Sequence, residues 1–174
     1  LFNDPVSQAQ FMPQSNPLPS HEQLTNEMQQ MIDVQTQMDD PLDAGRKKIQ
    51  AHYFADGPLT SLPPGHIMDI LSQMLARPKR YSLEQATRMY LLAGISVYEA
   101  GVACWALKRQ YQTVRPGEFI PLMWKDKTLK RQFVAPYCPF LDIPGWSWKP
   151  YQLFNLNTPP FPEYPSGHSS FTSS

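Results

Sequence analysis

The sequence predicts an all-α fold, a helical bundle with long ordered loops. Apolar residues recur at helical spacing in several stretches, two of which open with a Ser followed three residues later by a Gln, the pattern of an N-terminal capping box. The 19 prolines lie mainly at the ends of the chain and between Pro116 and Pro165, which indicates irregular segments between helices. Neither alternating strand pairs nor an internal repeat is visible, so helices are expected to pack on helices.

The first two expected helices lie in the N-terminal part of the chain. Ser20 and Gln23 begin the first, and apolar residues at helical spacing, several of them Met, continue it to about Asp40. A second helix is expected over residues 41–54 and ends before a turn-rich loop. The Met stripe of the first helix is interpreted as core.

Two longer helices are expected next. Apolar residues of 67–75 share one helical face, and Pro78 ends that helix. Ser82 and Gln85 then form the second capping box and begin the longest helix, which is expected to reach about Tyr111.

The chain is expected to divide into an arm and one domain. Residues 1–19 are polar, proline-bearing and aperiodic, which predicts an extended N-terminal arm, and residues 20–174 are expected to form the N-terminal part of a helical domain. Small helix-starting residues follow Gly167, but only about two turns fit before Ser174, too few for a stable helix by itself. We therefore expect the fold to be incomplete at its C-terminus.

Charge and hydropathy restrict the partners. Lys plus Arg and Asp plus Glu both number 15, so the formal net charge is zero, and no long-range field favours nucleic acid or an anionic membrane. The most apolar stretch, Met89 to Ala106, approaches the length of a membrane span but contains Glu99. We interpret it as a central bundle helix rather than a transmembrane segment.

The two cysteines and the start of the chain say little about the compartment. Cys104 and Cys138 could form one disulfide, but no pattern fixes their distance, and we expect free, buried thiols. No signal peptide is visible, although the sequence starts at Leu1. Localisation is not determined, and secretion or the periplasm is favoured.

A short C-terminal motif carries the sharpest chemical signal. Ser166 offers a hydroxyl, Gly167 allows close approach of the backbone, and a helix that starts there directs N–H groups at one point, as an oxyanion site requires. His168 would stand beside the anion and could transfer a proton. The alternative is a histidine that caps the helix or packs in the loop.

Two cations, on a second stretch of the sequence, could face the same anion. Lys108 stands near the end of the longest helix and Arg115 seven residues later, before Pro116. The two side chains could converge on one polyanion. Alternatively, Lys108 and Arg109 complement the helix C-terminus and Arg115 is solvated.

Taken together, Lys108-x6-Arg115-Pro116 and the tetrapeptide at 165–168 resemble the first two of three motifs of the type 2 phosphatidic acid phosphatase and vanadium haloperoxidase superfamily. The flank 158–168 is similar to the haloperoxidase branch, and the resemblance extends from about Tyr53 to the end. It implies that Lys108 and Arg115 bind vanadate oxygens. It also implies that Ser166 and the Gly167 amide add hydrogen bonds and that His168 is the catalytic acid and base.

Three further positions follow from the same resemblance. In the chloroperoxidase type a Trp lies three residues before the motif lysine and a Phe seven before the motif histidine, which here are Trp105 and Phe161. The resemblance implies that both line a halide pocket, whereas aromatic residues usually only pack. Asp56 is expected to be a carboxylate that contacts and orients the anion-binding side chains without touching the anion itself.

The resemblance implies vanadate as cofactor, with phosphate as an analogue, and hydrogen peroxide and halide as substrates. Vanadate and the phosphoryl transition state are both five-coordinate oxyanions, so the same cations and amides stabilise either. Vanadium would act as the Lewis acid that activates peroxide, which oxidises halide to hypohalous acid.

The family's third motif, which brings the histidine that bonds the metal, is not matched. None of His21, His52 and His66 stands in the required order. No metal ligand is therefore assigned in this chain, and without an axial nitrogen vanadate should bind only loosely. We expect a second polypeptide or a missing C-terminal segment to complete the domain. Homo-oligomers are compatible with the sequence. This chain alone is expected to be inactive.

Two alternatives stay open. One is an acid phosphatase of the same superfamily, in which His168 protonates the leaving group of a phosphomonoester. The other is a degenerate structural subunit that keeps the helical scaffold inside a larger assembly.

Overall fold

The computed structural model describes residues 18–37, 43–57, 59–76, 80–132, 140–151 and 158–174. These residues are mostly helical, which confirms the all-α class. The expected arm over residues 1–19 lies almost wholly outside the described residues, and its structure stays a prediction. The elements are α2 (His21–Thr36), α3 (Asp43–Tyr53), α4 (Leu62–Leu75), α5 (Leu83–Tyr111), α6 (Pro116–Met123), β1 (Thr128–Gln132), β2 (Leu141–Pro144), the 3-10 turn η1 (Gly145–Ser147) and α7 (Gly167–Thr172).

The chain divides into two compact units, each built from separate stretches of sequence. The α5 unit contains Asp56–Thr113 and Phe161–Ser174, with α4, α5 and α7. The α2 unit contains Ser15–Ala55 and Val114–Pro160, with α2, α3, α6 and the strands. The prediction of one helical domain over residues 20–174 neither required nor excluded this division.

The α5 helix begins where the sequence predicts. Ser82 caps it: its hydroxyl accepts a hydrogen bond from the Gln85 amide at 3.2 Å, and the Ser82 amide donates to Gln85 Oε1 at 2.8 Å. At the other end Gln112 adopts a left-handed conformation, with φ 45° and ψ 46°, and terminates the helix. The predicted extent, from Ser82 to about Tyr111, is confirmed.

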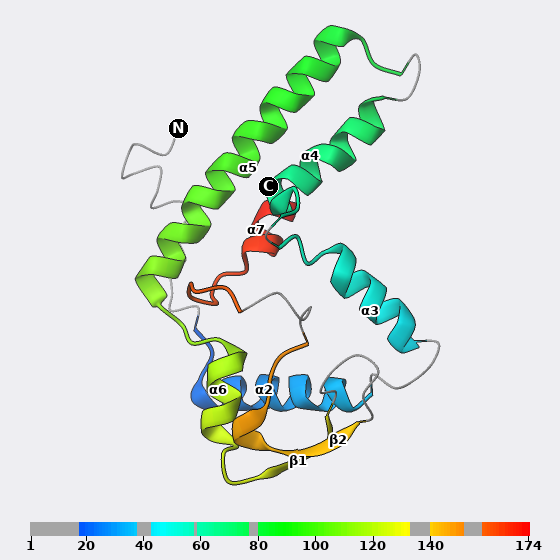
Figure 1. Ribbon diagram of the computed structural model, residues 1–174. Helices are drawn as coiled ribbons and strands as arrows, with labels where there is room; N and C mark the ends of the chain where they lie inside the picture. The colour runs from blue at the N-terminus through cyan, green and yellow to red at the C-terminus, as the bar shows by residue number, and fades with distance from the viewer. Residues whose placement is uncertain (1–17, 38–42, 58, 77–79, 133–139, 152–157) are drawn as a thin grey trace. The chain divides into compact units, whose positions relative to one another are not determined.

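In the α5 unit α4 and α5 lie side by side and run in opposite directions, and the short α7 packs on both (Figure 1). The hydroxyl of Tyr90 on α5 donates to Ser72 Oγ on α4 at 2.6 Å. This hydrogen bond links the two helices and restricts their sliding along each other. The helix pair therefore forms the support on which the motif at 166–168 rests.

Much of the apolar surface of α5 is exposed. Leu91, Leu92 and Tyr98 are each more than 60% exposed. Leu83–Met123 contains a window long and apolar enough to cross a membrane by length and composition alone. Such a surface also suits packing against further helices of a bundle, and our interpretation as a bundle helix stays a prediction.

The α2 helix also begins at a capping box. The Ser20 hydroxyl accepts from the Gln23 amide at 3.2 Å, and the Ser20 amide donates to Gln23 Oε1 at 2.8 Å. The helix ends at Thr36, earlier than the predicted Asp40, which lies outside the described residues. The Met stripe is core in part, since Met28 is buried while Met31 is exposed.

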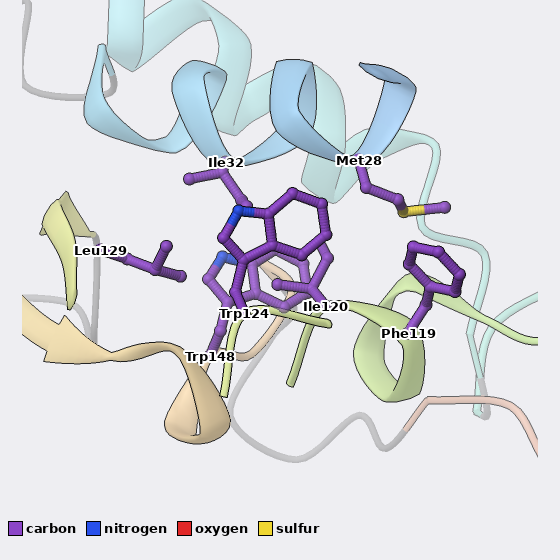
Figure 2. Close-up of a cluster of buried hydrophobic side chains, with 7 residues drawn as sticks. All are labelled: Met28, Ile32, Phe119, Ile120, Trp124, Leu129 and Trp148. Atoms are coloured by element: carbon purple, nitrogen blue, oxygen red, sulfur yellow. The ribbon is translucent and has the colours of Figure 1, made fainter. Parts of the chain in front are cut away.

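The hydrophobic core of the α2 unit joins α2, α6, β1 and the residue after η1 (Figure 2). Two tryptophans lie at its centre, and Trp124 donates from its indole nitrogen to Gln29 Oε1 at 3.2 Å. The cluster consists of Met28, Ile32, Phe119, Ile120, Trp124, Leu129 and Trp148.

A small two-stranded antiparallel sheet accompanies the helices of the α2 unit and was not predicted from the sequence. Thr128 pairs with Pro144 and Leu129 with Ile143, but the register shifts before Gln132. Arg131 has φ 50° at the irregularity, and its amide donates to the Asp142 carboxylate at 3.0 Å. The bulge breaks the alternation of apolar and polar residues, so the sequence pattern did not indicate a strand.

Ile120 tests the α2-unit core. It is fully buried in the cluster, so Ile120→Ala should lower the free energy of unfolding by about 2–5 kcal/mol, through lost transfer energy and the cavity left behind. Leu122→Ala is the matched control on the same helix, because Leu122 is 69% exposed. Urea denaturation followed by circular dichroism measures both, and equal losses would contradict this account of the core.

Candidate functional site

Lys108 lies on the buried face of α5, with Cys104 and Leu107. Only 2% of it is exposed. Its ammonium donates to the carbonyl oxygens of Pro162 and Glu163, at 2.6 and 2.7 Å. A buried cation needs such acceptors, and here they belong to the segment that leads into the second motif. The structure therefore brings the first motif's lysine to the second motif's loop.

The same segment is attached to the end of α5 at other points. The Glu163 amide donates to the Thr113 carbonyl at 3.2 Å, and the Tyr164 amide donates to the Thr113 hydroxyl at 2.7 Å. The rings of Tyr111 and Tyr164 meet edge to face, with centroids 5.6 Å apart. Thr113 was not among the predicted site residues.

Cys104 is a free, buried thiol, as predicted. Its Sγ lies 3.7 Å from the carbonyl oxygen of Pro165. Its predicted counterpart Cys138 lies outside the described residues.

The second motif begins α7. Ser166 is the N-cap, and its hydroxyl accepts a hydrogen bond from the Ser169 amide at 3.3 Å. Gly167 and His168 form the first turn, and both Ser166 and His168 are exposed. The hydroxyl of Ser166 therefore has a structural role as a cap, and the imidazole of His168 is accessible to solvent.

Two glycines lie where α7 packs against α5. A Cβ built at Gly167 would lie 3.4 Å from the Trp105 ring, and one built at Gly101 would lie 3.0 Å from the Phe171 ring. A side chain at Gly101 would force the Phe171 ring to shift by a few tenths of an ångström, whereas a Cβ at Gly167 would make ordinary van der Waals contact with Trp105. The close packing of α7 on α5 therefore depends on Gly101 more than on the glycine of the motif.

Aromatic rings surround the lysine head group. Trp105 and Phe161 are in contact, with centroids 5.4 Å apart, and the Lys108 ammonium lies 5.8 and 5.1 Å from the two rings. Trp105 is 43% and Phe161 37% exposed, so neither is an ordinary core residue. Phe171, at 6.0 Å from the Trp105 ring, completes the group and was not predicted.

Asp56 contacts a histidine. Its carboxylate oxygens lie 2.9 and 3.0 Å from Nδ1 of His66, and the two side chains are 10% and 14% exposed. Because a carboxylate only accepts, Nδ1 carries the hydrogen. The expected orienting role of Asp56 toward the anion ligands stays a prediction.

Arg115 belongs to the α2 unit, where it is the N-cap of α6. The following Pro116 occupies the first helical position, which proline favours. The expected convergence of the Arg115 and Lys108 side chains on one anion stays a prediction.

The donor chemistry of the predicted site fits an oxyanion. An ammonium, a hydroxyl, a backbone amide and an imidazole can all donate to oxygen, from Lys108, Ser166, Gly167 and His168. Within the described residues no group of three or more His, Cys, Asp or Glu side chains could hold a metal cation. The residues present suit vanadate or phosphate, which is bound through its oxygens.

Comparison with protein-family models identifies the second half of the chain. A family model described as the VCPO second helical-bundle domain matches residues 88–174, where VCPO denotes vanadium chloroperoxidase. No curated protein and no solved structure matches. The matched region starts within α5 and contains both motifs.

Replacing Lys108 tests its structural contacts. Lys108→Met keeps much of the side-chain volume but leaves two carbonyls without their donor, so the free energy of unfolding should fall by about 3 kcal/mol. Arg109→Met is the control, because Arg109 is the exposed neighbour. Urea denaturation gives both values. If the two variants lost the same stability, the lysine would not hold the loop.

Proposed function

The chain belongs to the vanadium chloroperoxidase family, and from this premise we propose that it provides part of a vanadate site that oxidises halide with hydrogen peroxide. The observation that carries the proposal is the hydrogen bonding of the buried Lys108 ammonium to Pro162 and Glu163, directly before Ser166–His168. It explains how two motifs more than 50 residues apart can act as one site.

Lys108, Arg115, Ser166 and Gly167 would hold the oxyanion. Lys108 would provide fixed positive charge in a place largely screened from water, where an ion–dipole or ion–ion contact is stronger than at the surface. Arg115 would add a second, planar cation, and the Gly167 amide a neutral donor. Bound vanadate supplies the Lewis acid that activates peroxide.

His168 would move protons at this site. It is exposed on the first turn of α7, so a proton can pass between its ring and water. Ser166 fixes the start of the helix that carries it.

Trp105 and Phe161 would form the halide pocket. Their ring edges carry partial positive charge, and the Lys108 ammonium lies within 6 Å of both ring centres. A soft anion such as bromide could rest against such a surface. This group of rings beside the cation favours a haloperoxidase over a phosphatase.

The third motif, with the histidine that would bond the metal, would come from a further segment or a second polypeptide. The Asp56–His66 pair lies in the α5 unit, and Asp56 would orient the anion ligands without contacting the oxyanion itself.

Arg115 can be tested on this chain directly. Arg115→Ala should weaken binding of orthovanadate about tenfold or more, the size expected for one charge-assisted hydrogen bond. Arg109→Ala is the control, an arginine outside the predicted ligand set. Titration followed by vanadium-51 NMR measures both, and unchanged affinity in Arg115→Ala would remove it from the site.

His168 is tested in protein completed with the third motif. His168→Ala should lower halide-dependent consumption of peroxide by about a hundredfold or more, while vanadate affinity changes little. Trp146→Ala is a control, since Trp146 is exposed and belongs to the α2 unit. Release of phosphate from a phosphomonoester without peroxide consumption would instead support the phosphatase.

A further inference from the structure

We infer that Thr113 is a positioning residue, which holds the segment before Ser166–His168 in place for anion binding. The inference rests on the proposed function, because it assigns a residue to the same site. Thr113 is the last residue of its stretch of the α5 unit and is neither charged nor one of the motif residues.

The end of α5 brings Thr113 into position. Gln112 is in the left-handed conformation, and its amide closes the helix on the Lys108 carbonyl at 3.0 Å. The chain leaves the helix axis at this residue. Both acceptors of Thr113, its carbonyl and its hydroxyl, are then available to the segment 162–164.

Thr113 binds two consecutive amides. Glu163 donates to its carbonyl at 3.2 Å and Tyr164 to its hydroxyl at 2.7 Å. Any residue can offer the carbonyl, but the shorter bond requires a side-chain acceptor at position 113. A β-branched side chain also has restricted χ1, which keeps the hydroxyl in place.

Thr113 and Lys108 hold the same segment by complementary hydrogen bonds, one as an acceptor and the other as a donor. Lys108 donates to the carbonyls of Pro162 and Glu163, whereas Thr113 accepts from the amides of Glu163 and Tyr164. Glu163 is thus held at both its amide and its carbonyl. Two residues beyond Tyr164, Ser166 begins α7.

The neutral contact matters most when an anion binds. An oxyanion attracts the Lys108 ammonium and competes with the two carbonyls for its hydrogens. The hydrogen bonds to Thr113 involve no charge and do not compete. Thr113 would therefore keep the loop in register while Lys108 is shared with the anion.

The experiment compares three variants of the full chain with wild type. Thr113→Val removes the hydroxyl at nearly constant shape, Thr113→Ser restores it, and Thr87→Val removes a hydroxyl of α5 that bonds only within its own helix. Hydrogen exchange of the Tyr164 amide and affinity for orthovanadate are both measured, with circular dichroism to verify folding.

Thr113→Val should lose protection of the Tyr164 amide and bind vanadate about fivefold more weakly, as expected for one neutral hydrogen bond. Thr113→Ser should recover most of both properties, and Thr87→Val should match wild type. Equal losses in the Ser and Val variants, or full amide protection in Thr113→Val, would overturn the inference.

The two proposals fail in different ways. A wild-type chain that does not bind vanadate would overturn the proposed site, and with it the role of Thr113 in anion binding. Wild-type binding that Thr113→Val leaves unchanged would overturn only the role of Thr113.

Discussion

The burial of one ammonium group determines how the candidate site is built. Lys108 is placed by helical spacing on the inner face of α5, and a charge there is stable only if acceptors surround it. The chain supplies two main-chain carbonyls from a segment more than 50 residues later, so the charge selects where that segment lies. The packing of α7 on α5, the aromatic rings near the ammonium and the second motif all lie beside this contact.

Local features of the fold were predictable from the sequence. Both capping boxes, at Ser20 and Ser82, use residues three apart, and each is present in the structure. The extent of α5 was predicted for the same reason. By contrast, β1 pairs with β2 through residues that are not neighbours in sequence, and the pairing contains a bulge at Arg131. The alternation of apolar and polar residues that would predict a strand is therefore missing.

The site was predicted only in part, for a similar reason. A sequence displays Lys108 as a cation but does not show what it donates to, and simple spacing suggested Arg115 as its neighbour. The structure shows main-chain acceptors beside Lys108 and puts Arg115 in the α2 unit. Thr113 was missed because a single threonine after a helix has no distinctive pattern, and its partners are amides that carry no side-chain signal. Trp105 and Phe161 are in contact, and their role as a halide pocket stays a prediction.

The sheltered sulfur of Cys104 has a chemical consequence. Thiols are among the protein groups that strong oxidants attack first, and their susceptibility follows exposure. Only 2% of Cys104 is exposed, and it sits one helical turn from Lys108, beneath the second motif. A catalyst that releases hypohalous acid would damage itself at any accessible thiol near its outlet. In the proposed haloperoxidase, the burial of Cys104 would remove one such point of self-inactivation and so prolong the working life of the site.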